Sequence, residues 1–257
     1  MRAARRGSGM SALPLRVMVA LAAAALVIMS HTPSSLTAVR VWDLPTRAFH
    51  WVLALTIVGS VVSAQIGGGA MVWHFRFGYL VFTLLAFRAL WGLIGGRWSR
   101  FASFIYAPGT VLRYLRGESR ADEHHEVGHS PLGSLSVFAL LGFLALQVAT
   151  GLVADDDIAN VGPLNRFVSG GVANQATHWH IDFGKWILLA LVALHVATVL
   201  YYLWRRGRNL VRPMIVGDKA LPAGTPPAAD SAATRLLALA VAALCAAGVG
   251  WVVNLGG

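Results

Sequence analysis

The chain has 257 residues, of which 56% are hydrophobic and 12% are charged, and its mean hydropathy is +0.63. A soluble domain carries about twice that share of charged residues, so the composition excludes an ordinary soluble enzyme and indicates several membrane-spanning segments. The formal net charge of +10 does not imply a nucleic-acid partner, because the arginines lie in loops that flank the apolar segments, as expected on one face of a membrane.

Four apolar segments form the predicted core, and each is close to the roughly 20 residues that a helix needs to cross the hydrocarbon. They run from Phe49 to Ile66, from His74 to Ile94, from Leu132 to Val153 and from Ile181 to Trp204. A fifth, from Leu236 to Val253, follows a Pro- and Ala-rich stretch, LPAGTPPAAD. Helices are expected because backbone groups in lipid must be satisfied within their own segment. The predicted fold class is an all-α integral membrane protein, a four-helix transmembrane bundle with a C-terminal fifth transmembrane helix.

The loops predict an orientation and a division into regions. Arginines precede the first segment, fill the loop between the second and third, and follow the fourth, whereas the opposite loops carry almost no positive charge. The positive-inside rule places the arginine-rich loops in the cytoplasm. The predicted regions are an N-terminal extension (1–38), the four-helix domain (39–220), and a linker with the tail helix (221–257). The extension has arginines before an apolar stretch, and the sequence leaves open whether it is signal-like or an upstream start.

Histidines are the informative feature of this core, because ionisable residues inside membrane helices are costly and usually functional. His180 and His195 lie on the predicted fourth helix, where their spacing separates them by about 22 Å along the axis. His74 is near the same outer surface as His180, and His50 is at the inner level of His195. The four therefore sort by depth into two pairs. Two imidazoles at each level are what a six-coordinate, non-covalently bound haem needs.

Four further residues fit a haem at each level. Gly78 and Gly184 each follow a proposed ligand by one helical turn, where a missing side chain would let a flat porphyrin approach the backbone. Arg88 lies on nearly the same face as the histidine of the second helix but at the inner level, and a buried arginine needs an anion such as a haem propionate. Arg47, just before the histidine of the first helix, could serve the same haem.

Other interpretations stay open at this point. Any one histidine in a membrane helix can be a hydrogen-bonding group between helices. His178 is an alternative to His180. On an ideal helix, however, it points roughly 100° away from the face that carries His195. The alternative function is a membrane transporter or ion channel that uses the histidines as a relay without haem. Against it, the sequence has no inverted repeat and no carboxylate within the core spans.

Five stretches carry a family resemblance. They are VRVWDLPTRAFHW, WHFRFGYLVFTLLAFRALWGLIGGRWSRFASFI, GHSPLGSLSVFALLGFLALQVATGL, LLALVALHVATVLYY and NLVRPMIVGDK. In these residues, between 39 and 220, the chain resembles the prokaryotic cytochrome b561 family, which includes the b-type cytochrome subunit of nickel–iron hydrogenases.

The resemblance implies two b haems per chain, ligated by His50, His74, His180 and His195. It implies a multi-pass protein of the bacterial inner membrane that passes electrons between membrane quinone and a c-type cytochrome or hydrogenase-like partner, a cytochrome rather than a classical enzyme. A homodimer is left open. His129, in GHSPLG, is not expected to be a ligand. The family's paired histidines on the fourth helix lie one residue closer together than here, which predicts a local bulge at the start of that helix.

Overall fold

The computed structural model describes residues 35–119 and 125–256. Thr37–Gly257 forms one compact unit. All but the last few residues of the predicted N-terminal extension (1–38) lie outside the described part of the chain.

Five helical stretches are long and apolar enough to cross a membrane, which confirms the five predicted spans. They are α2 (Leu44–Ile66), α3 (Met71–Ile94), α5 (Pro131–Val153), the continuous run of α6 (Gly170–His178), the π-helical turn η4 (Trp179–Gly184) and α7 (Lys185–Arg205), and finally α9 (Ala232–Asn254). The connections contain the short helices α4 (Pro108–Arg116) and α8 (Val211–Val216) and the 3-10 turns η1 (Gly68–Ala70), η2 (Phe101–Ser103) and η3 (Asn165–Phe167). The protein is therefore an all-α membrane protein.

Side-chain caps fix where four of the five membrane-spanning stretches begin. Asp43 caps α2, Ser130 caps α5, Ser169 caps α6 and Ser231 caps α9, and each accepts a hydrogen bond from a backbone N–H of the first turn. These oxygens satisfy donors that have no partner within the helix. Between α2 and η1 the chain turns at Gly67 and Gly68, whose φ angles of 69° and 52° are accessible to glycine at little cost.

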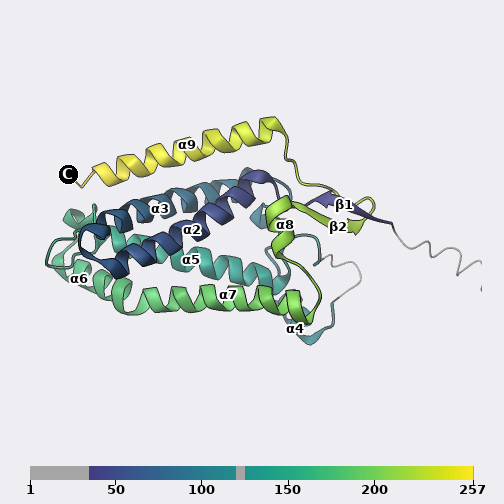
Figure 1. The fold of residues 1–257 in the computed structure, drawn as a ribbon, viewed down its shortest axis with the longest axis horizontal. Helices are drawn as coiled ribbons and strands as arrows, with labels where there is room; N and C mark the ends of the chain where they lie inside the picture. Colours follow the sequence, from purple (N-terminus) through teal and green to yellow (C-terminus); the bar gives the residue numbers. More distant parts are fainter. Residues whose placement is uncertain (1–34, 120–124, 257) are drawn as a thin grey trace, which may run out of the picture. The chain divides into compact units, whose positions relative to one another are not determined.

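The membrane helices form a bundle in which α2 packs on α3, α3 packs on α5, and α5 packs on α6 and α7 (Figure 1). The tail helix α9 packs along α3 and makes a smaller contact with α2. The buried core side chains come from α2, α3, α5, α7 and α9: Phe49, Leu53, Val81, Phe87, Trp91, Leu144, Leu188, Ala238 and Cys245. Helices α2 and α7 are not among the closely packed pairs. The separation between α2 and α7 is where the inner histidine pair lies.

One end of the bundle carries the arginine-rich loops, and we call it the inner end after its predicted orientation; the opposite end is the outer end. A small ribbon that the sequence did not predict forms at the inner end, where β1 (Leu36–Arg40) pairs with β2 (Asp218–Pro222) (Figure 1). Its apolar side chains pack against Trp42 and Val127. The ribbon thus joins the start of α2 to the segment that follows α8.

The predicted linker before α9 is packed against the inner end of the bundle. The N–H of Ala228 donates to the carbonyl oxygen of Arg40 at 2.7 Å, and the indole N–H of Trp98 donates to the carbonyl oxygen of Pro226 at 2.9 Å. Asp230 forms salt bridges with Arg40 at 3.2 Å and with Arg235 of α9 at 3.0 Å. These contacts fasten the tail helix to the start of α2, which the Pro- and Ala-rich sequence alone does not reveal.

Candidate cofactor sites at the two ends of the bundle

The structure brings the four predicted histidines together in two pairs. At the outer end the ring centroids of His74 (α3) and His180 (η4) lie 6.0 Å apart, and at the inner end those of His50 (α2) and His195 (α7) lie 6.4 Å apart. All four residues are half-buried. The pairing is the one that helix arithmetic predicts; ligation of a metal by these rings stays a prediction.

The separation within each pair fits two imidazoles on opposite sides of one metal ion. A metal–imidazole nitrogen bond is about 2.0–2.1 Å, and the ring centroid lies about 1 Å further out, so two such rings on one ion have centroids about 6 Å apart. Within the described residues no group of three or more His, Cys, Asp or Glu could hold a metal by itself. Each pair would therefore need further metal donors from outside the described residues, which a porphyrin would supply.

Hydrogen bonds orient the outer pair. Nδ1 of His74 lies 3.0 Å from the carbonyl oxygen of Ser60, and Nδ1 of His180 lies 2.9 Å from the carbonyl oxygen of Gln147. A carbonyl can only accept, so each Nδ1 carries the proton and donates it. Nε2 of both rings then carries a lone pair and can bind a metal. In metal-binding histidines the other ring nitrogen commonly donates a hydrogen bond that fixes the tautomer and the ring orientation, as Nδ1 does here.

The inner pair lacks this arrangement. Nδ1 of His50 is buried without a hydrogen-bond partner among the described residues. The first turn of α2 is instead held by α8 through its neighbours: Trp51 donates its indole N–H to the carbonyl oxygen of Met214 at 3.0 Å, and Arg47 donates to that of Ile215 at 2.5 Å. The inner ring is thus positioned by its helix rather than by a direct hydrogen bond.

The π-helical turn Trp179–Gly184 is the local bulge that the sequence predicts at the start of the fourth helix. It accommodates the additional residue and directs His180 toward His74. His178 has an exposed side chain and pairs with Asp182 at 2.9 Å, outside the bundle interior. A π-helical turn leaves a backbone carbonyl without its usual partner, and the side-chain amide of Gln147 donates to the carbonyl oxygen of His180 at 2.7 Å. The structure therefore favours His180 over His178.

The two predicted arginines differ in their partners. Arg88 is buried, its guanidinium lies over the ring of Phe101 at 4.5 Å, and its Nη1 has no hydrogen-bond partner among the described residues. A desolvated guanidinium with a spare donor fits the predicted contact with an anion. Arg47 already donates to α8 and its Nη2 lies 3.8 Å from the carboxylate of Asp230, although its Nε, like Nη1 of Arg88, is buried without a partner among the described residues. Its guanidinium therefore has an established structural use at the inner end.

The two predicted glycines also differ. No atom lies within 4 Å of where a Cβ on Gly78 would be, so the face of α3 one turn from His74 borders open space, and its contact with a porphyrin stays a prediction. A Cβ on Gly184 would instead meet the side chains of Gln147 and Trp179. The reason given for Gly184 is therefore wrong: its missing side chain permits close packing of η4 on α5.

Sequence reasoning missed Gly151 on α5. A Cβ at this position would lie 2.8 Å from Cε1 of His180, so the absent side chain makes the room in which the imidazole sits. This role depends on which residues of α5 face η4, and that pairing cannot be predicted from a single sequence.

It also missed Asp43, which is fully buried at the inner end. Its carboxylate accepts hydrogen bonds from the N–H of Thr46 at 2.8 Å, from Oγ of Ser99 at 2.7 Å and from the indole N–H of Trp91 at 3.3 Å. A Cβ on Gly96 would collide with the same carboxylate. Asp43 thus ties the first turn of α2 to the end of α3, next to the inner histidine pair.

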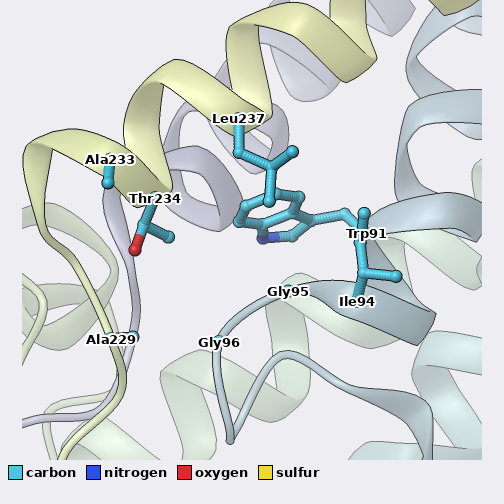
Figure 2. A pocket seen from close by; sticks show the side chains of 8 residues that line it. All are labelled: Trp91, Ile94, Gly95, Gly96, Ala229, Ala233, Thr234 and Leu237. Carbon is cyan, nitrogen blue, oxygen red and sulfur yellow. The ribbon is translucent and has the colours of Figure 1, made fainter.

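Beside this network lies a cavity of about 270 Å³ between the end of α3 and the start of α9. Figure 2 shows the indole of Trp91 beneath Leu237, with Gly95 and Gly96 along the opposite wall and Thr234 at the side of α9. None of the four paired histidines lines it. The cavity is therefore separate from the histidine pairs.

The sequence of the chain is similar to that of known proteins. A family model described as prokaryotic cytochrome b561 matches residues 41–217. A probable Ni/Fe-hydrogenase B-type cytochrome subunit of Bradyrhizobium diazoefficiens is 24% identical over 214 residues, which cover 70% of this chain and 85% of the relative. Proteins of the same name are 26% identical in Rhodobacter capsulatus (71% and 82% covered) and 27% identical in Cupriavidus necator (63% and 79% covered).

Proposed function

We propose, from the premise that the chain belongs to the prokaryotic cytochrome b561 family, that it holds two haems, one between each histidine pair, and conducts electrons between them across the membrane. Membership of the family, together with five membrane-spanning helices, makes the protein a multi-pass b-type cytochrome of the bacterial inner membrane. The number of haems, their ligands and the redox partners are the proposed part.

The observation that carries the proposal is the presence of two matched histidine pairs at opposite ends of one bundle, with ring centroids 6.0 and 6.4 Å apart. The helix that supplies His180 and His195 separates the two levels by about 22 Å. Two haems at these levels would divide the electron's path across the roughly 30 Å hydrocarbon into shorter steps. A histidine relay for ions would not require two rings at metal-binding distance at each level.

The haem iron, when bound, supplies reversible one-electron chemistry. The protein's own groups set the conditions for it. The carbonyl oxygens of Ser60 and Gln147 hold the outer imidazoles in one tautomer. Between the levels, the side chains of Val81, Leu144 and Leu188 form an apolar core that excludes water. At the inner end, the buried guanidinium of Arg88 supplies a positive charge.

We also propose that electrons pass between membrane quinone and a hydrogenase-like or c-type cytochrome partner. The names of the relatives, which are hydrogenase cytochrome subunits, support the hydrogenase-like partner. The loop between α5 and η3 suits a docking contact. The carboxylate of Asp156 accepts hydrogen bonds from the N–H groups of Ile158, Ala159 and Asn160 at 2.9–3.0 Å, which preforms the loop. Hydrogen bonds from Asn160 lower the pKa of Asp156, so the loop stays acidic at physiological pH.

Reduction of the purified protein by a quinol, or by hydrogenase with hydrogen, identifies the partner.

The test is a reduced-minus-oxidised absorption spectrum of the purified protein, with the haem extracted and counted per chain. We expect b-type bands and two haems per chain. One haem per chain would contradict the two-site proposal while leaving a cytochrome. Folded protein without haem, from cells with adequate haem supply, would contradict the function and favour the ion-relay alternative, which ion-flux assays in vesicles then test.

Replacing Gly151 with alanine should weaken the outer site selectively. The added methyl group would lie 2.8 Å from Cε1 of His180, which is closer than van der Waals contact, so the imidazole would have to move. A shift of about 1 Å is enough to impair a preorganised site. We expect reduced occupancy of one haem by spectroscopic titration, with the helical content unchanged. Gly248→Ala on α9, where a Cβ meets nothing within 4 Å, is the matched control and should keep full haem content. Equal haem content in the two variants would contradict the assigned role.

A further inference from the structure

His129 is an unexplained histidine at the inner end. It lies in the loop just before α5, and its ring is stacked between Trp42, at a centroid distance of 4.7 Å, and Phe104, at 4.4 Å. Its Nδ1 is completely buried and has no hydrogen-bond partner among the described residues. Buried polar atoms are normally paired, so this nitrogen calls for a partner that residues 35–119 and 125–256 do not provide.

Arg88 presents a second unpaired donor beside it. The ring of Phe104 contacts His129 on one hand and lies 6.0 Å from the guanidinium of Arg88 on the other. Nη1 of Arg88 is buried without a partner, like Nδ1 of His129. The acid next to Arg88 is Asp43, whose oxygens already accept from Thr46, Ser99 and Trp91. Two buried nitrogens without partners among the described residues, from different segments, therefore lie near the ring of Phe104.

The loop that carries His129 is held in place from both sides. Nζ of Lys219, on β2, donates to the carbonyl oxygens of Val127 at 2.8 Å and Glu126 at 3.2 Å. The hydroxyl of Tyr106 donates to the carbonyl oxygen of His129 itself at 2.7 Å. Because these hydrogen bonds fix the backbone at and before His129, the position of the imidazole is preorganised, as binding sites require. The ribbon at the inner end thus has a use in positioning His129.

We propose that His129 and Arg88 together bind one carboxylate at the inner site, a propionate of the inner haem, with His129 as a neutral hydrogen-bond donor and positioning residue. The inference rests on the proposed function. An apolar, aromatic site disfavours a bare carboxylate, and a guanidinium with a second donor offsets that cost. His129 is thereby assigned to the inner site without being a ligand of the iron.

The protonation state of His129 agrees with this role. Burial, followed by the positive charges of Arg88 and Lys219, lowers the pKa of His129 to about 3. The ring is neutral at pH 7 and carries a single N–H, which it can donate. Hydrogen bonds and net charge near a haem tune its reduction potential. A donor that disperses the charge of the propionate favours the reduced iron, so its loss should lower the potential of the inner haem.

The experiment compares His129→Phe with the wild type by redox titration followed optically, together with redox-difference infrared spectra of the propionate carboxyl bands. Phenylalanine keeps an aromatic ring between Trp42 and Phe104 but has no donor. We expect a lower midpoint for one haem, an unchanged midpoint for the other, and a shifted carboxyl band. His129→Gln, which restores a donor, should recover part of the shift. His178→Phe, the same change at an exposed outer position, should leave the inner midpoint unchanged.

The outcomes separate the inference from the proposed function. Unchanged midpoints and carboxyl bands in His129→Phe, with full haem content, would overturn the assignment of His129. Equal shifts of both haems, or a shift that His129→Gln does not reduce, would show a general structural effect and would overturn it as well. If His129→Phe does not fold, His129→Gln compared with His129→Leu decides by the same criteria. Wild-type protein without haem would overturn the proposed function itself.

Discussion

Replacing His74 or His180 with alanine is expected to reduce the haem content from the proposed two to about one per chain, because both imidazoles of a level would be needed to hold its haem. His50→Ala and His195→Ala should remove the other haem and leave the first. The two levels lie about 22 Å apart along the helix that carries His180 and His195, so the loss should stay local. Haem extraction, with absorption spectra at low temperature to resolve the two components, measures both the number and the identity of the haem that remains.

His178→Ala is the matched control for this experiment. Its side chain is exposed and pairs with Asp182 rather than with a facing helix, so its removal should leave both haems in place. The opposite pattern, with haem lost from His178→Ala and kept in His180→Ala, would show that the π-helical turn adopts another register in the holoprotein. Loss of both haems from every single variant would point to one cooperative site and contradict two independent ones.

Replacing Asp43 with alanine is expected to destabilise the protein by about 2–4 kcal/mol. It removes a helix cap, worth about 1 kcal/mol, and leaves the buried donors of Ser99 and Trp91 unpaired at about 1–3 kcal/mol. It also removes the negative charge next to the buried guanidinium of Arg88. Unfolding by denaturant in detergent micelles, followed by far-ultraviolet circular dichroism, measures the change in the free energy of unfolding.

Asp43→Asn removes the charge but keeps part of the hydrogen-bond network. Asparagine retains Oδ1, which can cap α2 at Thr46 and accept from Trp91, whereas its amide group replaces the oxygen that accepts from Ser99. This variant should therefore lose less stability than Asp43→Ala. If both variants unfold at the wild-type denaturant concentration, the buried network contributes nothing to stability. If Asp43→Asn is as destabilised as Asp43→Ala, the charge beside Arg88 and the hydrogen bond from Ser99 together outweigh the cap and the bond from Trp91.

The five membrane spans could be read from the sequence because each is set by its own composition. An apolar run of about 20 residues has one low-energy state in lipid, a helix across the bilayer, wherever its neighbours lie. The level of each histidine follows from its position along such a helix. For the same reason, the sequence could pair His74 with His180 and His50 with His195 by depth before any contact between helices was known.

The failures have a common cause, since each concerns register between helices or contacts between distant segments. Gly184 was expected to face a porphyrin, but it packs against Gln147; Gly151 was overlooked, although it borders the ring of His180. Asp43 reads as an ordinary helix cap, and only the fold shows that Ser99 and Trp91 converge on it. Helical spacing says which residues share a face, but not which face meets which neighbour.

The sequence by itself determined the membrane class, the five spans that lie between residues 44 and 254 and the level of each histidine, because these depend on local apolarity and on the fixed rise of a helix. The tertiary structure decided which of His178 and His180 enters the bundle, since a π-helical turn changes the angular phase of every residue beyond it. It also decided that the ribbon and the linker close the inner end around Asp43 and His129. Those contacts join residues far apart along the chain, whose meeting depends on how the helices pack together.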